Sequence, residues 1–157
     1  MTAVPIGRAQ LRRRGESGLL LLAFGTMLAA ALQAGEQLAA TVVNMRFVKP
    51  LDEALLRELA PQYAAIVTLE ENTIGGGAGS AVAELLDSLG IGGPRLHIGL
   101  PDRFIEHGSR EQCLVDAGLD SASVQATIER WWRPLALNLN SARPATRIAA
   151  AVRSGPA

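Results

Sequence analysis

The stretch LEENTIGGGAGSAVAELL, residues 69–86, decides the fold of this chain. It starts at the end of an apolar run and passes through a turn rich in glycine (Gly75, Gly76, Gly77 and Gly79). After the turn, apolar side chains recur at the i, i+3, i+4, i+7 spacing of one helix face (Val82, Leu85, Leu86 and Leu89). We therefore expect a buried strand, a glycine turn and an amphipathic helix that Ser80 caps and Gly90 ends.

Apolar runs and amphipathic segments alternate along the rest of the chain as well. Strands are expected at residues 19–24, 40–48, 64–69 and 95–98. Further helices are expected at residues 26–39, 52–60, 109–118 and 121–133, with Pro134 as the stop signal of the last one. Strands that alternate with helices predict an α/β fold, a three-layer sandwich with a largely parallel sheet flanked by helices.

The chain has room for one domain, because it contains 157 residues, of which 48 % are hydrophobic and 19 % are charged. We expect a polar linker at residues 1–17, the folded domain at residues 18–133 and a basic tail at residues 134–157. The tail contains no acidic residue and three arginines (Arg143, Arg147 and Arg153), and we expect it to be poorly ordered.

The composition argues against several classes of partner and site. The formal net charge is zero, so a nucleic-acid partner has no electrostatic support. Cys113 is the only cysteine, which excludes an internal disulfide and a cysteine-rich zinc site. These features fit a reducing, cytoplasmic setting, which is the localisation we expect.

The uncharged run at residues 18–32 has two interpretations. It follows three arginines (Arg12, Arg13 and Arg14), as the apolar region of a secretory leader follows its basic start, and small residues come near Ala34. At 15 residues the run is short for a membrane span, which needs about 20, and we expect no membrane partner. The interpretation that we favour is a buried parallel strand followed by a helix, since such strands are continuous apolar runs.

Ligands and partners meet open α/β sheets at the carboxyl ends of their strands, so candidate site residues are sought there. Glu70 and Glu71 end a strand, and alternation directs them to opposite faces, which argues against a paired general acid and base. One of them should be exposed, and the other should pair with an arginine or cap nearby backbone.

The glycine turn and Ser80 can hold an anion through backbone N–H groups, or they can form a tight turn that packs against a neighbouring domain. We favour the second interpretation, because the sequence contains neither the G-x-G-x-x-G spacing nor a Gly-Lys-Ser/Thr motif at the turn. The loop after the last strand adds Asp102, Arg103 and His107 as candidates for contact with a partner. His97, by contrast, is expected to be a core or partly buried histidine.

Five short motifs, taken in order, resemble one known family. They are AFGTM (residues 23–27), MRFVKPLD (45–52), EENTIGGGAGS (70–80), GLPDRFIEHGS (99–109) and AGLD (117–120). The chain resembles the C-terminal domain of the 1-deoxy-D-xylulose-5-phosphate synthase family, a branch of the transketolase family. The EEN motif with its GG-x-GS turn is shared more broadly with transketolases and 2-oxoacid dehydrogenase β-subunits. The resemblance covers residues 4–132.

The resemblance implies part of a homodimeric enzyme that uses thiamine diphosphate and Mg²⁺. Such enzymes condense pyruvate with glyceraldehyde 3-phosphate for isoprenoid and thiamine biosynthesis. Their cofactor ligands and catalytic residues lie in earlier domains, and the motifs that carry them are absent here. We therefore expect no catalytic, cofactor-binding or metal-binding residue in this chain, and no activity or bound cofactor when it is alone.

The partners implied by the resemblance are the upstream thiamine-diphosphate-binding and pyrimidine-binding domains and a homodimer partner. The implied role is domain packing and support of the dimer, with the glycine turn and the loop at residues 99–109 as the contact surfaces. One alternative stays open at this point. The chain can instead be a stand-alone module without catalysis that binds a small anion or a protein through residues 75–80.

Overall fold

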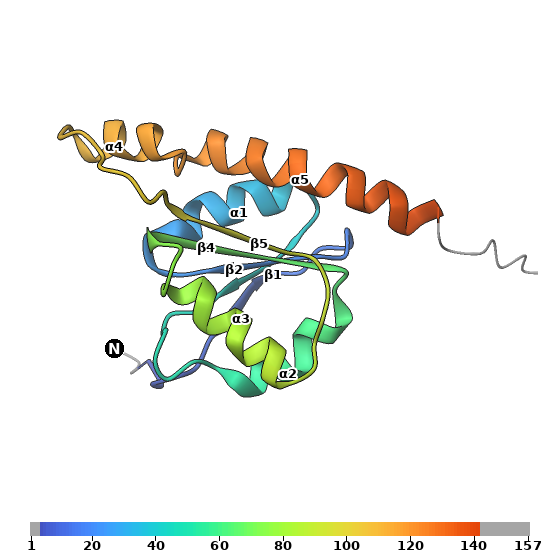
Figure 1. The fold of residues 1–157 in the computed structure, drawn as a ribbon. Helices are drawn as coiled ribbons and strands as arrows, with labels where there is room; N and C mark the ends of the chain where they lie inside the picture. The colour runs from blue at the N-terminus through green and yellow to red at the C-terminus, as the bar shows by residue number, and fades with distance from the viewer. Residues whose placement is uncertain (1–3, 142–157) are drawn as a thin grey trace, which may run out of the picture.

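The computed structural model describes residues 4–141, which form a five-stranded sheet with helices on both faces (Figure 1). In chain order the elements are β1 (Gln10–Arg13), β2 (Leu19–Ala23), the 3-10 helix η1 (Gly25–Met27), α1 (Leu28–Gln37), β3 (Thr41–Asn44), α2 (Glu53–Leu59), the 3-10 helix η2 (Ala60–Gln62), β4 (Ala65–Thr73), α3 (Ala78–Ser88), β5 (Arg95–Leu100), α4 (Arg110–Ala117) and α5 (Ser121–Ser141). Most of the tail expected at residues 134–157 lies outside the described residues.

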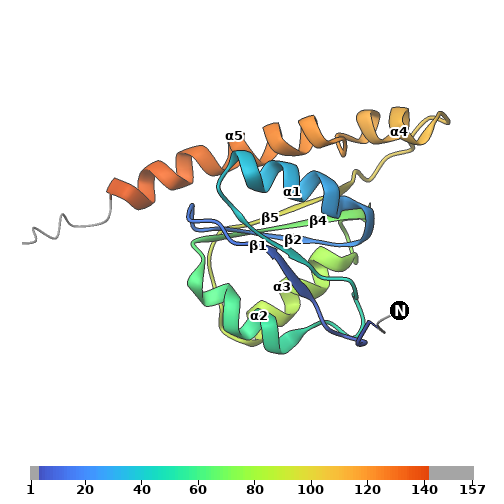
Figure 2. The same ribbon diagram turned by 180° about the vertical axis from the view of Figure 1, so that it is seen from behind.

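The sheet has the strand order β1-β3-β2-β4-β5. The last four strands of that order are parallel, and β1 pairs with β3 in the antiparallel direction at one edge. Figures 1 and 2 show α1 and α5 on one face of the sheet and α2 and α3 on the other. The predicted α/β sandwich of three layers with a largely parallel sheet is therefore confirmed.

The central strand β2 connects the two halves of the core. Its five residues are all buried, and successive side chains enter opposite layers because a strand alternates its faces. Leu19 and Leu21 pack in the cluster beneath α1 and α5, whereas Leu20 and Leu22 pack in the cluster with α2 and α3. The favoured interpretation of the uncharged run, a buried strand followed by a helix, is confirmed. Within residues 4–141 no helix is both long and apolar enough to cross a membrane.

Three helix ends follow their sequence signals. The Asp52 carboxylate accepts a hydrogen bond from the backbone N–H of Leu55 at the start of α2. Ser109 and Gln112 form a complete capping box at the start of α4, and Gly118 ends that helix in the left-handed conformation, with φ of 70°. These helix ends therefore lie where the local sequence predicts them.

Three expectations about element bounds were wrong. β4 continues past residue 69 to Thr73, because its backbone still pairs with β5 although the side chains after Glu70 are exposed. β3 is shorter than expected and ends at Asn44. α5 passes through Pro134, since Leu135 and Ala136 beyond it pack on the core and offset the hydrogen bond that proline removes.

The N-terminal segment contributes a strand to the domain. β1 lies within residues 1–17, which the sequence assigns to a linker, and its Gln10 and Leu11 pair with Asn44 and Val43 of β3. The backbone N–H of Ala9 also donates to the buried Asp52 carboxylate. The domain limits at residues 18 and 133 stay predictions.

We predict that Leu21→Ala lowers the free energy of unfolding by about 3 kcal/mol, because it leaves a cavity in a fully buried layer. Leu137→Ala is the matched control, since that leucine on α5 is 65 % exposed and its loss should change stability by about 0.5 kcal/mol or less. Urea unfolding of both variants checks the pair. Equal losses would contradict the position of β2 at the centre of the core.

Candidate functional site

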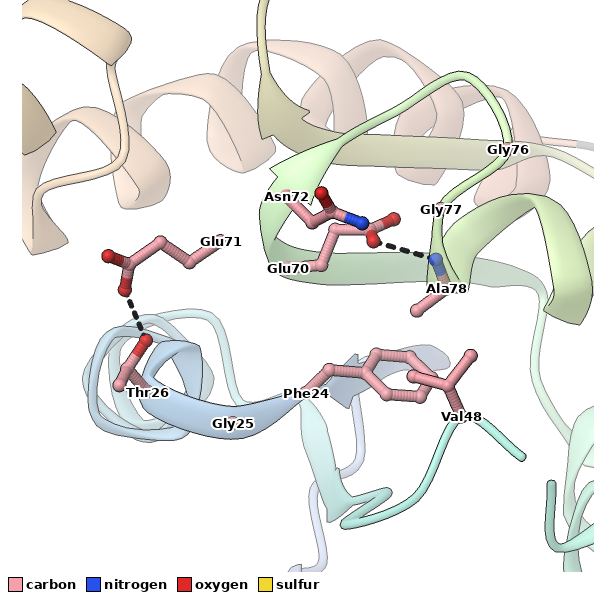
Figure 3. Close-up of a pocket in the computed structure, with 10 residues that line it drawn as sticks. All are labelled: Phe24, Gly25, Thr26, Val48, Glu70, Glu71, Asn72, Gly76, Gly77 and Ala78. Carbon is pink, nitrogen blue, oxygen red and sulfur yellow. Dashed lines mark hydrogen bonds between the residues drawn. The ribbon is translucent and has the colours of Figure 1, made fainter. Parts of the chain in front are cut away.

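The candidate site lies where two neighbouring strands send the chain to opposite faces of the sheet. β2 leads into α1 on one face, and β4 leads into α3 on the other. In open α/β sheets a crevice forms at such a point, outside the carboxyl ends of the strands. The structure has a pocket of about 480 Å³ there, shown in Figure 3 and lined by Phe24, Gly25, Thr26, Val48, Glu70, Glu71, Asn72, Gly76, Gly77 and Ala78.

Glu70 is the buried polar residue at this site. Its side chain turns toward the start of α3 and is 3 % exposed. One carboxylate oxygen accepts a hydrogen bond from the backbone N–H of Ala78 at 2.6 Å, and the other accepts from the N–H of Gly79 at 2.8 Å. The carboxylate thus satisfies two of the free N–H donors of the first helical turn and lies at the positive end of the helix dipole. Of the two expected roles, Glu70 therefore caps nearby backbone.

Two glycines make this capping contact sterically possible. A Cβ atom on Gly77 would lie 2.2 Å from the Thr73 carbonyl oxygen and 2.4 Å from Glu70 Oε2. A Cβ on Gly79 would lie 2.6 Å from both Thr68 Oγ1 and His97 Nδ1. Gly75 and Gly76 have open space around them, although Gly76 needs its positive φ of 74°. The turn therefore contains glycines that permit close packing and glycines that only shape the loop.

Ser80 does not cap α3, contrary to the sequence expectation. The N-cap is Gly77, and Ser80 lies inside the first turn of the helix. Its hydroxyl accepts from the N–H of Gly76 at 3.0 Å and donates to the Ile74 carbonyl at 2.9 Å. Ser80 therefore closes the glycine turn, because Glu70 already holds the N–H groups that a capping side chain would use.

Glu71 lies on the opposite side of the pocket and joins two other elements. Its Oε2 accepts a hydrogen bond from the Thr26 hydroxyl (Figure 3). The same oxygen accepts from the Arg110 guanidinium at 2.6 Å. The Thr26 hydrogen bond and then the Arg110 ion pair hold the pKa of Glu71 below its usual value. Glu71 is the exposed glutamate of the two, and it, not its buried neighbour, has the arginine partner. The sequence did not predict this ion pair for the exposed glutamate. The ion pair connects the carboxyl edge of the sheet to the first residue of α4.

His97 and Thr68 lie side by side on β5 and β4 beneath α3. They are partners in the strand register, and Thr68 Oγ1 lies 2.7 Å from His97 Nδ1. Burial lowers the pKa of His97 below its usual value; the Glu70 charge opposes that change, and the Arg95 charge adds to it. His97 is therefore a partly buried structural histidine, as expected from the sequence.

The loop after β5 places its three candidate residues away from the pocket. The Arg103 guanidinium donates to the backbone carbonyl of Asp116 at 2.6 Å and so fastens the loop to the end of α4. His107 borders a second hollow, of about 410 Å³, together with Glu71 and Cys113. Asp102 and Arg103 line neither hollow. The predicted role of these residues, and of the glycine turn, in contacting another domain stays a prediction.

The carboxylates and the helix N–H groups at this edge already have partners within the domain. Glu70 and Glu71 point to opposite sides and are each held by other donors. Among residues 4–141 no three side chains of His, Cys, Asp or Glu come together as a metal site would require. The backbone amides of Ala78 and Gly79 already have an anionic partner in Glu70, so a phosphate would have to displace a buried carboxylate to reach them.

Comparison with known proteins agrees with this description. The family model for the transketolase C-terminal domain matches residues 7–124. The chain belongs to the transketolase C-terminal domain family. The match begins before β1 and ends inside α5, so it includes the whole sheet and the candidate site of the domain.

The curated relatives of this domain carry the name expected from its motifs. The chain is 61 % identical over 128 residues to the 1-deoxy-D-xylulose-5-phosphate synthase of Thioalkalivibrio sulfidiphilus, which covers 82 % of this chain and 20 % of that enzyme. It is 57 % identical over 129 residues to the synthase of Methylococcus capsulatus, with the same shares covered. The family resemblance drawn from the sequence is therefore confirmed, and the chain spans about a fifth of the length of these relatives.

A solved structure shares the fold. It is titled a split-gene transketolase in an inactive β4 tetramer, and it superposes with a TM-score of 0.73 at 34 % identity. The similarity covers 82 % of this chain and 43 % of the other. The transketolase C-terminal domain thus accounts for most of the described residues.

Sequence analysis did not single out several residues of the site, Thr26, Asn72 and Arg110 among them. Thr26 and Arg110 come from segments distant in sequence and meet at Glu71 only in the folded chain. Asn72 lines the pocket and follows Glu71 in the EEN motif. That position is the feature of the sequence that could have identified Asn72 as a site residue.

We predict that Gly77→Ala destabilises the domain by about 2 kcal/mol, because its Cβ would push the Glu70 carboxylate away from the start of α3. Gly75→Ala is the matched control in the same turn, since no atom lies within 4 Å of its Cβ position, and it should change stability by about 0.5 kcal/mol or less. Urea unfolding measures both. If the two substitutions cost the same, the capping contact does not depend on Gly77.

We also predict that acidification destabilises the domain through His97. Its folded pKa is lowered, so the unfolded chain takes up a proton first and stability falls as the pH drops below about 6.5. The free energy of unfolding should therefore decrease more between about pH 7.5 and 5.5 in the natural chain than in His97→Gln, which cannot titrate. The same decrease in both chains would show that burial of His97 has no such effect.

Proposed function

We propose that this chain is the C-terminal domain of a 1-deoxy-D-xylulose-5-phosphate synthase and that it supports the catalytic domains and the dimer of that enzyme. The observation that carries the proposal is the 61 % identity over 128 residues to a named synthase. The motifs of the resemblance, residues 23–27 and 70–80, come together at the candidate site. Because the chain spans about a fifth of its relatives, the reaction is proposed for the assembled enzyme.

The proposed reaction is the condensation of pyruvate with glyceraldehyde 3-phosphate, with thiamine diphosphate and Mg²⁺ as cofactors of the whole enzyme. The described residues of this domain do not fit those groups. The helix start that would attract a diphosphate holds Glu70, and no side-chain cluster suits a magnesium ion within the described part of the chain. The domain is therefore proposed to contribute packing surface, and the cofactors are proposed to bind the upstream domains.

The proposed partners are the upstream thiamine-diphosphate-binding and pyrimidine-binding domains and a second copy of the enzyme. The solved structure titled a split-gene transketolase supports the idea that enzymes of this family can be divided between chains. The proposed contact surfaces are the glycine turn, with Gly75, Gly76 and Ser80, and the loop that carries Asp102, Arg103 and His107. We also propose a cytoplasmic location, which fits the single thiol, Cys113.

The stand-alone anion-binding module is not favoured. Its helix start is already occupied by a buried carboxylate that accepts two backbone hydrogen bonds. An added anion there would meet the negative charge of Glu70 in a poorly solvated position, where like charges repel strongly. Protein binding through the turn is compatible with the proposed role, because Gly75 and Gly76 are exposed and have free space around them.

The proposal predicts the activity of a chimeric synthase. Residues 7–132 of this chain should replace the matching segment of the Thioalkalivibrio sulfidiphilus enzyme and retain most of its formation of 1-deoxy-D-xylulose 5-phosphate. The same enzyme truncated before that segment should lose activity, because its catalytic domains and dimer lose a packing surface. A coupled assay of product formation compares the two proteins with the natural enzyme.

Two controls sharpen this test. The chimera with Gly77→Ala should lose thermal stability and activity together, whereas the chimera with Gly75→Ala should match the unmodified chimera. A chimera that is folded and dimeric but inactive would contradict the proposal, and so would full activity of the truncated enzyme.

A further inference from the structure

Another pocket lies at the opposite end of the sheet from the candidate site. It has a volume of about 440 Å³ and opens at the amino ends of β2 and β4, beneath the last turns of α5 (Figures 1 and 2). The residues that line it include Glu16, Ser17, Gln62, Trp132, Ala136 and Leu139. None of them belongs to the five motifs of the family resemblance, so the pocket has no role in the function proposed above.

The polar side chains of this pocket offer hydrogen-bond acceptors. Glu16 is exposed and forms no ion pair with any other residue in the range 4–141. The Gln62 side chain donates to the Glu58 backbone carbonyl at 2.9 Å, which leaves its own carbonyl oxygen without a donor in the described part of the chain. The Ser17 hydroxyl is buried and has no partner among the same residues. Buried hydroxyl groups usually have one, so the pocket lacks a donor.

A guanidinium group fits this arrangement of acceptors. It is positively charged and carries five N–H donors and no acceptor, so it suits the carboxylate and the amide oxygen together. Trp132 lies beside these acceptors, and a guanidinium packs well against aromatic rings. The methylene groups of an arginine would also cover Leu139, which is 43 % exposed at the pocket.

The sequence supplies an arginine next to this pocket. Trp132, Ala136 and Leu139 line the pocket from α5 and follow one another by four and three residues, as residues on one side of a helix do. Arg143 comes four residues after Leu139 and so continues the same spacing, just before Pro144. Long side chains on a helix point back toward its start, which is the direction from that position to the pocket.

We propose that the guanidinium of Arg143 binds in this pocket, where it donates to the Glu16 carboxylate and to the Gln62 side-chain carbonyl beside Trp132. The contact ties the end of α5 to the turn between β1 and β2 and closes the amino end of the sheet. Part of the segment expected to be a poorly ordered tail then belongs to the folded domain. Such a contact is independent of the synthase assignment, because all of its residues belong to this chain.

Thermal unfolding of the full chain tests the contact. Arg143→Gln and Glu16→Gln should each lower the melting temperature by about 3 °C, because each removes one partner of the ion pair. The double variant should lie no more than about 1 °C below either single variant, since both substitutions remove the same interaction. Arg147→Gln is the matched control, because it removes the same charge from the same segment and should leave the melting temperature unchanged.

Nuclear magnetic resonance of the same chain locates the arginine directly. The Nε–H proton of Arg143 should show a nuclear Overhauser contact with the Trp132 ring and should exchange with water more slowly than that of Arg147. Both effects should be lost in Glu16→Gln, while the other signals of the folded domain remain. The proposal is overturned if Arg143 shows no such contact, or if Arg143→Gln lowers the melting temperature no more than Arg147→Gln does. Additive losses in the double variant would also overturn it, because Glu16 and Arg143 would then act separately.

Discussion

The carboxyl edge of this domain depends on one hydrogen-bonded carboxylate, that of Glu70. It ends the buried part of β4, and both of its oxygens accept from the first backbone N–H groups of α3. Hydrogen bonds to a charged carboxylate are strong in a buried position without water. Leaving the carboxylate or the N–H groups unpaired there would lower the free energy of unfolding. The contact brings strand and helix so close that Gly77 has no room for a Cβ, and at Gly79 a Cβ would meet Thr68 and His97. Gly77 is therefore required by the close approach of the helix to its capping residue, whereas Gly75 and Gly76 only shape the loop.

The same contact explains why a sequence that looks suited to an anion has another role. Glycine turns at helix starts bind phosphates because their N–H groups are free and positively polarised. Here the protein supplies the anion itself, from the preceding strand. Glu71, the next residue, points the other way and ties the edge to Thr26 and Arg110. Two adjacent glutamates thus hold the two sides of one crevice, each through hydrogen bonds to other elements.

The domain presents two different surfaces to possible partners. The carboxyl edge is concave and polar, and it gathers residues from β2, β4 and the turn before α3. The outer side of α4 and α5 carries two exposed apolar side chains, Val115 and Leu137. The two regions meet at the ion pair between Glu71 of the edge and Arg110 of α4.

The sequence by itself determined the architecture, because its signals are local. Continuous apolar runs, the apolar spacing of residues 82–89 and the caps at Asp52 and Ser109 depend on nearby residues, and all of them appear in the structure. Only the tertiary structure decided the capping of α3 and the length of α5. Ser80 is a residue type that caps helices, but the Glu70 carboxylate accepts from the first N–H groups of α3 instead. Packing of Leu135 on the core lets α5 continue through Pro134. Such outcomes depend on which residues, apart in sequence, come into contact. Local sequence patterns do not show those contacts, because they form only when the chain folds.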